Sequence, residues 1–221
     1  MKKAVCLLSG GLDSAATAYI AKKQGYSIYA LTFDYNQRHR REVQHAKDIA
    51  RKLGAVEHKI IQLDLASIGG SALTSRRIKV PKTGSKGIPA TYVPARNTIF
   101  LSIALAYAEV VGADSIFIGA NHIDYSGYPD CRPEYFKAFQ KMTNLATKRG
   151  VEGHKIKIKT PIIKMSKADI VKKAVALKVP LEQTWSCYKG GKKACGRCDS
   201  CTLRKHGFKQ AGIKDPAEYE T

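Results

Sequence analysis

The residues with the clearest chemistry lie near the N-terminus: Leu8, Ser9, Gly10, Gly11, Leu12, Asp13 and Ser14. An apolar run at residues 4–8 and good helix formers at residues 14–23 flank them, which predicts a buried strand, a glycine turn and a helix start. Amides of such a turn converge with the positive end of the helix dipole, a setting that binds phosphate. We therefore expect this turn to hold a phosphate or pyrophosphate, with Asp13 or Ser14 also capping the helix.

The glycine turn differs from two other phosphate loops. No Gly-Lys-Ser/Thr follows it, as a Walker P-loop requires, and the third glycine of the dinucleotide fingerprint is missing. Residues 9–14, Ser-Gly-Gly-Leu-Asp-Ser, resemble the pyrophosphate loop of the N-type ATP pyrophosphatases. That family cleaves ATP between the α and β phosphates and activates an oxygen as an adenylate. The alternative is a plain glycine turn whose Asp and Ser only cap a helix.

Four of the six cysteines cluster near the C-terminus, with two short gaps between them: Cys187, Cys195, Cys198 and Cys201. A gap of two residues lets two thiolates face one ion, and four thiolates suit tetrahedral zinc. Because protein would fill all four positions, the zinc would be structural. Two disulfides and an iron–sulfur cluster are the alternatives. Disulfides are disfavoured in the reducing, cytoplasmic compartment that we expect in the absence of a signal peptide.

Apolar runs and helical periodicity predict the elements that position these residues. Further strands are expected at residues 27–33, 57–63, 115–119 and 156–158, and further helices at 40–53, 97–111, 133–147 and 166–179. This alternation predicts an α/β, doubly wound, mostly parallel sheet with ligands at the carboxyl ends of its strands. We interpret residues 65–89 as a lid loop. We expect a catalytic domain at residues 1–180 and a zinc-binding segment with little core of its own at residues 181–221.

The chain carries a large positive charge, with 38 Lys and Arg against 18 Asp and Glu, a net +20. Such charge attracts ATP, an anionic substrate or RNA; the alternative is a solvated, lysine-rich surface. We find no arginine-rich arm and no array of stacking aromatic residues, so we do not expect direct nucleic-acid binding. No apolar run reaches the length of a membrane span.

Three further motifs follow the glycine turn: residues 33–39, Phe-Asp-Tyr-Asn-Gln-Arg-His; residues 93–97, Val-Pro-Ala-Arg-Asn; and residues 126–132, Ser-Gly-Tyr-Pro-Asp-Cys-Arg. With the four cysteines, they resemble the 7-cyano-7-deazaguanine synthase family in the same order, over nearly the whole chain. The resemblance implies a Rossmann-like, adenine nucleotide alpha hydrolase-like fold. It implies a ligase that turns 7-carboxy-7-deazaguanine, ammonia and ATP into the nitrile preQ0, for queuosine or archaeosine biosynthesis. It also implies Mg²⁺ with the ATP, one structural Zn²⁺ per chain and a homodimer.

The resemblance assigns ATP binding to Phe33, beside the adenosine, and to the turn itself: Leu8, Ser9, Gly10, Gly11, Leu12, Asp13 and Ser14. Arg96 is expected to bind phosphate or the substrate carboxylate. Asp124 and Asp130 suit the guanine-like edge of the substrate, and Tyr128 would stack on its base. Lys167 would neutralise phosphate charge, so the expected catalytic residues are Asp13, Arg96 and Lys167. The alternatives are a surface salt bridge for Arg96, turn capping for the two aspartates and a solvated side chain for Lys167.

Two positions depart from the bacterial pattern of that family. Ala95 stands where Gly precedes the Arg-Asn pair, and His122 stands where the pattern has an acid. His122 is either a proton shuttle or a histidine packed against the pocket wall. The alternative function is a tRNA thiolase or lysidine-type enzyme on the same fold, although thiolation usually needs a reactive cysteine pair. A zinc-stabilised nucleic-acid binder would leave the glycine turn without a role.

Overall fold

The computed structural model describes residues 1–38, 40–75, 77–80, 87–123 and 127–220. Its centre is a five-stranded sheet in the order β3-β2-β1-β4-β5, in which every pairing is parallel. The strands are β1 (Lys3–Leu7), β2 (Ser27–Asp34), β3 (Glu57–Gln62), β4 (Ser115–Phe117) and β5 (Lys157–Lys159). The chain runs outward from β1 to β3 and then returns to the other side of β1. This confirms the doubly wound sheet, whose ligand crevice lies beside the carboxyl end of β1.

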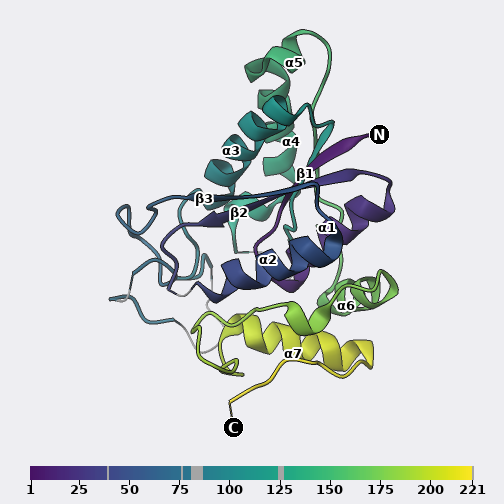
Figure 1. Cartoon of the computed structure of the whole chain (residues 1–221). Coiled ribbons are helices and arrows are strands. Elements are labelled where there is room, and N and C mark those ends of the chain that lie inside the picture. The colour runs from purple at the N-terminus through teal and green to yellow at the C-terminus, as the bar shows by residue number, and fades with distance from the viewer. Residues whose placement is uncertain (39, 76, 81–86, 124–126, 221) are drawn as a thin grey trace.

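Each face of the sheet carries its own core. Ala4 and Cys6 of β1 pack with α1 (Leu12–Lys23), α2 (Arg41–Leu53) and α6 (Lys167–Ala176). Val5 and Leu7 point to the other face and pack with α3 (Arg96–Val111) and α4 (Pro133–Ala146). Figure 1 shows the sheet between these two layers of helices. Because side chains alternate along β1, this strand contributes residues to both cores.

The expected helices are present within a few residues of their expected bounds. Gly54 and Gly112 end α2 and α3 in the left-handed conformation, with φ of 68° and 66°. Pro133 opens α4, and a capping box between Ser166 and Asp169 starts α6. Two helices were not expected: the short α5 (Lys148–Val151) and α7 (Asp199–Ala211), together with the 3-10 turns η1 (Pro129–Cys131) and η2 (Leu181–Gln183).

The segment after residue 180 contributes to two clusters of buried residues. Helix α7 lies beside α6 (Figure 1), and its Phe208, which is 1% exposed, joins the core that contains Phe117 and Ile170. A second, small cluster consists of Trp185, Cys187, Ala194, Cys195, Cys198 and Cys201. The segment thus has only a small core of its own, and α7 joins a larger one. The domain boundary at residue 180 stays a prediction.

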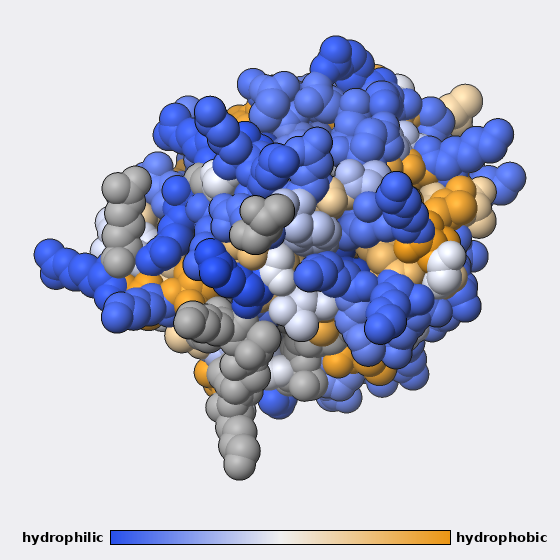
Figure 2. Space-filling model, turned by 90° about the horizontal axis from the view of Figure 1, so that it is seen from below, coloured by the Kyte–Doolittle hydropathy of each residue, from blue (hydrophilic) through white to orange (hydrophobic). Residues whose placement is uncertain are grey.

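The face on which α7 lies is mainly hydrophilic when it is viewed from below in Figure 2. The C-terminal segment carries several exposed basic residues: Lys189, Lys192, Lys193, Arg197, Lys205 and Lys209. Much of the positive charge is therefore at the surface. Across the described ranges, no helix has both the length and the apolar composition needed to cross a membrane.

The expected lid loop has no helix or strand among its described residues. It is nevertheless attached to the body of the protein. Leu73 is buried, and the guanidinium of Arg38 donates to the carbonyls of Ser75 and Ile78 at 3.1 and 2.8 Å. Part of the segment therefore packs on the sequence that follows β2, and its opening and closing stay a prediction.

Candidate active site

The carboxyl ends of β1, β2 and β4 border a cavity of about 250 Å³. Its walls include most of the residues expected from the sequence: Leu8, Ser9, Gly11, Leu12, Asp13, Ser14, Phe33, Arg96, Tyr128 and Lys167. Gly10 and Asp130 do not line it, and Asp124 lies outside the described residues. Side chains that are far apart in the sequence thus meet at the ligand edge of the sheet.

Two serines close the β1–α1 turn on itself. The Ser9 amide donates to Ser14 Oγ at 3.1 Å, the two hydroxyl oxygens lie 3.0 Å apart, and Ser14 Oγ donates to the Gly11 carbonyl at 3.0 Å. Gly11 is the N-cap of α1, and no side chain forms a capping bond. The expectation that Asp13 or Ser14 caps α1 is therefore wrong, because both lie inside its first turn. Like those of any helix start, the first amides of α1 have no acceptor within the helix, and this suits an anion.

Two glycines allow backbones to pack around this turn. Gly10 has a φ of 86°, and a Cβ there would lie 2.9 Å from the Ala46 amide nitrogen and closer still to the Glu42 carbonyl oxygen of α2. At Gly119, which follows β4, a Cβ would lie 2.8 Å from the Ser14 amide nitrogen. The Gly10 carbonyl also accepts a 2.9 Å bond from the Trp185 amide. Gly10 therefore serves the packing of α2 and the C-terminal segment rather than close approach to a ligand.

A buried ion pair lies beside the turn. Lys167 Nζ is 2.8 Å from both Asp13 Oδ1 and Asp13 Oδ2, and the two side chains are only 9% and 21% exposed. Because the Lys167 side chain is buried and paired with Asp13, the alternative of a solvated lysine is excluded. Lys167 is also the first residue of α6, where the helix dipole disfavours a cation. The pair places one positive and one negative group beside the β1–α1 turn, at the edge of the cavity.

Arg96 begins α3 and lines the cavity. Its Nη1 lies 3.4 Å from Tyr35 Oη, and its guanidinium carbon lies 6.0 Å from the centre of the Tyr35 ring. Among the described residues its contact is thus a tyrosine and not the carboxylate that a surface salt bridge would require. On the same wall Phe33 stacks on Phe100, with ring centres 4.1 Å apart. This part of the cavity combines a flat apolar surface with a two-pronged cation.

The wall after β4 is formed by η1 and the residue before it. Tyr128 Oη lies 2.8 Å from Thr91 Oγ1, and burial raises the pKa of the tyrosine. Asp130 Oδ2 accepts the Asn97 amide at 3.0 Å, so this carboxylate holds the start of α3. This bond joins η1 to α3, and a role of Asp130 toward a substrate stays a prediction. Burial raises the pKa of the Cys131 thiol to about 12, which keeps it protonated.

Several cavity residues were not expected from the sequence. Glu42 of α2 lines the cavity, and burial raises the pKa of its carboxyl to about 7 although the Arg96 charge opposes the shift. The C-terminal segment supplies a further wall: Trp185, Ser186, Tyr188, Ser200 and Arg204. Position gives a weak signal for Glu42, because it lies just after the 33–39 motif. No local pattern identifies the others, since only tertiary packing brings them to the cavity.

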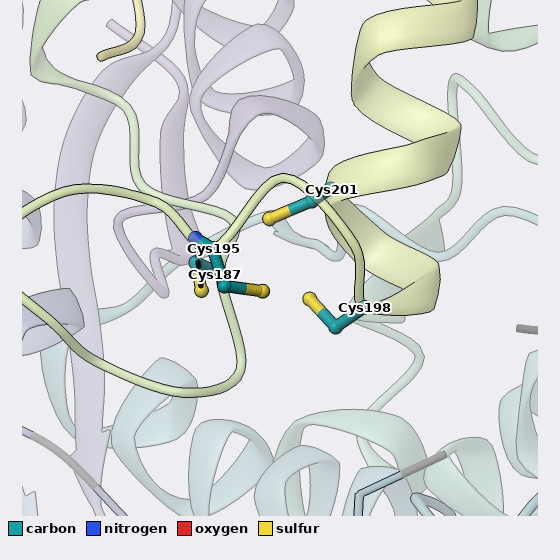
Figure 3. A group of neighbouring side chains, drawn as sticks. All are labelled: Cys187, Cys195, Cys198 and Cys201. Carbon is teal, nitrogen blue, oxygen red and sulfur yellow. Dashed lines mark hydrogen bonds between the residues drawn. The ribbon is translucent and has the colours of Figure 1, made fainter. Parts of the chain in front are cut away.

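The four clustered cysteines come together at the start of α7 (Figure 3). All are buried, and their sulfur atoms lie within 4.8 Å of one another. The amides of Lys189 and Cys195 donate to Cys187 Sγ at 3.4 and 3.3 Å, and with hydrogen bonds from the Cys198 and Cys201 thiols they lower its pKa. Tetrahedral zinc with bonds of about 2.3 Å needs sulfurs about 3.8 Å apart. The donor set therefore fits zinc, and all six cysteines of the chain are free rather than in disulfides.

A family model described as "Queuosine biosynthesis protein QueC" matches residues 3–212. This chain belongs to the QueC family. Curated QueC relatives named 7-cyano-7-deazaguanine synthase align over its full length. The protein from Cellvibrio japonicus is 58% identical over 99% of this chain and 98% of its own, and the protein from Methylococcus capsulatus is 56% identical over 100% of both chains.

More distant solved structures share the QueC fold. A 4-thiouridine synthetase, solved with RNA and bound ATP, aligns with a TM-score of 0.51 and 21% identity over 96% of this chain and 50% of its own. A predicted subunit of tRNA methyltransferase from Methanocaldococcus jannaschii aligns with a TM-score of 0.52 and 18% identity over 100% of this chain and 93% of its own. At these identities the likeness concerns the fold alone.

Proposed function

We propose that this QueC-family chain is an ATP-dependent carbon–nitrogen ligase. It converts 7-carboxy-7-deazaguanine and ammonia into 7-cyano-7-deazaguanine, preQ0, through an adenylate and an amide, for queuosine or archaeosine biosynthesis. The observation that carries this proposal is the full-length similarity to proteins named as that synthase. The cavity supports it, because the β1–α1 turn and two cationic side chains, Arg96 and Lys167, line it together.

ATP binds with its phosphates at the β1–α1 turn. Amides of the turn and the hydroxyls of Ser9 and Ser14 hold the pyrophosphate, and the α1 dipole favours its charge. Lys167 lies close enough to share its ammonium between Asp13 and a phosphate oxygen. Phe33 offers an apolar surface to the adenosine. Mg²⁺ enters with ATP as part of the substrate and offsets phosphate charge.

The deazaguanine carboxylate lies against Arg96, whose two-pronged donors suit its two oxygens. One carboxylate oxygen attacks the α-phosphorus of ATP, and pyrophosphate leaves with the electron pair of the broken P–O bond. Ammonia then attacks the activated carbon, AMP leaves, and the amide forms with loss of a proton. A second activation makes the amide oxygen a leaving group. The amide oxygen attacks the α-phosphorus of ATP, pyrophosphate leaves and one N–H proton is lost. Departure of that oxygen on AMP, with loss of the remaining N–H proton, gives the nitrile.

The proposal includes a structural zinc ion, one per chain, held by Cys187, Cys195, Cys198 and Cys201. Four thiolates would close the site to other ligands, so zinc supplies folding energy and no reaction step. We also include a cytoplasmic location and a homodimer. Exposed apolar side chains near the ends of α3, α4 and α5 support a partner surface: Val110, Leu145 and Val151.

The direct test incubates the purified protein with ATP, Mg²⁺, ammonium and 7-carboxy-7-deazaguanine, and follows nitrile, AMP and pyrophosphate by mass spectrometry and phosphate assay. The Arg96→Ala variant should lose about 100-fold in kcat/KM, mainly through KM for the carboxylate, and Arg96→Lys should recover part of this loss. Arg51→Ala, an exposed change on α2, is the matched control. ATP consumption that ignores the deazaguanine, or that requires tRNA instead, would contradict the proposal.

A further inference from the structure

Helix α7 has a glycine in its interior without a backbone reason for it. Gly207 is buried and helical, and its φ is not in the left-handed region. Glycine inside a helix costs about 1 kcal/mol relative to alanine. Space explains the glycine, because a Cβ there would lie 2.8 Å from Lys167 Cβ and closer still to Lys167 Cγ. Gly207 therefore leaves a notch in α7 that the aliphatic stem of Lys167 fills.

The notch is held in place by contacts on both sides of it. Toward the start of α7, Cys198 is the N-cap residue and Cys201 lies in the first turn, so the cysteine cluster fixes this end. Arg204 donates to Asp215 from Nε and Nη2 at 3.0 to 3.1 Å, and from Nη1 to Thr184 Oγ1 at 2.8 Å. Phe208, the residue after the glycine, is buried in the main core. The surface against Lys167 therefore has little freedom to shift.

The other end of the Lys167 side chain lies at the cavity. Its ammonium contacts both oxygens of Asp13 in the first turn of α1. The stem has to pass α7 before the ammonium reaches the pyrophosphate turn. If a side chain at position 207 filled the notch, Lys167 would have to change its rotamers, and its ammonium would move away from Asp13.

We propose that Gly207 is a positioning residue of the ATP site: its missing side chain directs Lys167 onto Asp13 and the nucleotide phosphates, and α7 links that geometry to the four-cysteine cluster. This inference rests on the proposed role of Lys167 toward ATP. It gives the C-terminal segment a task beyond forming a wall of the cavity. The segment sets the direction of a charged group that belongs to another helix.

The test compares Gly207→Ala with His206→Ala, an exposed neighbour on the same helix, in the full-length, metal-loaded protein. Calorimetry measures ATP affinity, steady-state kinetics separate KM for ATP from KM for the carboxylate, and thermal unfolding reports stability. Gly207→Ala should weaken ATP binding about tenfold, since one charge-assisted contact is displaced, and should leave KM for the carboxylate nearly unchanged. His206→Ala should match the wild type in every measurement.

The Lys167→Ala background separates positioning from a general packing effect. If Gly207 acts through Lys167, adding Gly207→Ala to Lys167→Ala should change ATP affinity less than twofold, because the displaced group is already absent. A further tenfold loss in the double variant would overturn the inference, as would wild-type affinity in Gly207→Ala. Should Gly207→Ala alone fail to fold, it is combined with Lys167→Gly, which removes both the Cβ and the Cγ that the new side chain would meet; a folded protein would support the steric contact, and an unfolded one would overturn it. Unchanged ATP binding in Lys167→Ala would contradict the site assignment but leave nitrile formation by the wild type intact.

Discussion

The β1–α1 turn and the C-terminal segment form walls of the same cavity but are held in place differently. Bonds within residues 9–14 close the turn, as in the Ser9–Ser14 contacts. The C-terminal segment depends on distant partners: Trp185 bonds to Gly10, and the four cysteines come together from two sides of a loop. Neighbouring residues thus shape the turn, whereas tertiary contacts and a metal-compatible cluster shape the segment. A substitution in the C-terminal segment, far from the turn in sequence, should therefore still weaken ATP binding.

The largest effect is expected where the turn is joined by charge to α6, the helix against which the C-terminal segment packs. Asp13→Ala removes the carboxylate that pairs with the buried Lys167 ammonium. Nitrile formation should fall about 100-fold or more, and the free energy of unfolding should fall by about 3 kcal/mol. Urea unfolding and product assays measure the two losses. The double variant Asp13→Ala/Lys167→Ala should regain stability without regaining activity; recovery of activity would remove this pair from the mechanism.

The next effect isolates the C-terminal segment. Cys198→Ser removes one sulfur from the cluster and leaves a serine at the N-cap of α7. We expect loss of bound metal, a lower melting temperature and at least about tenfold weaker ATP binding, although the turn itself is unchanged. Metal analysis, thermal unfolding and calorimetry measure these changes. Cys6→Ala, a change in β1 outside the cluster, should keep its metal. A Cys198→Ser protein with full metal content and stability would refute the ligand assignment.

A matched pair of alanine substitutions separates packing from binding within the turn. At Gly10 the positive φ and the backbone of α2 oppose any side chain, so Gly10→Ala should lose about 3 kcal/mol of stability. At Gly11 an added Cβ would lie 3.4 Å from Ser9 Oγ, and the residue faces the cavity. Gly11→Ala should therefore lose about 1 kcal/mol or less and weaken mainly ATP binding. Chemical unfolding and calorimetry on both variants would show whether the two glycines differ in this way.

The smallest effect concerns pH. Burial raises the pKa of the Glu42 carboxyl from 4.5 to about 7 in the folded protein. Because the folded state binds this proton more tightly, the contribution of Glu42 to stability is complete below about pH 4.5 and is lost as pH rises through 7. ATP binding should also weaken a few-fold above pH 7, when the carboxylate becomes charged. Glu42→Gln should flatten both profiles, and the exposed Glu182→Gln should not; an unchanged profile in Glu42→Gln would reject this source of pH dependence.

Strands and amphipathic helices of the sheet layers were predictable, because apolar periodicity marks them directly. Helix α7 was not predictable, since Gly207 interrupts the run of helix-forming residues. The packing of Phe208 and the cysteine cluster stabilises this helix instead. The expected cap by Asp13 or Ser14 was wrong, because the helix starts two residues earlier than the apolar pattern suggests. The need for glycine at position 10 was also beyond the sequence, because it comes from the packing of α2 against the turn.

The candidate site divides in the same way. Residues of contiguous motifs, such as Ser9, Arg96 and Tyr128, could be named from their types and order. Trp185 and Arg204 carry no such signal, because their place at the cavity follows from the path of the chain after α6. The burial of Lys167 was likewise not predictable from local sequence, since it depends on the notch that Gly207 leaves in α7.

The bond from the Trp185 amide to the Gly10 carbonyl joins two residues that are far apart in the sequence. During translation the β1–α1 turn therefore leaves the ribosome well before the residue whose amide bonds to it. A nascent or prematurely terminated chain would thus contain the turn but lack the cavity wall that includes Trp185. Any shortened version built around the first strands would inherit the same defect.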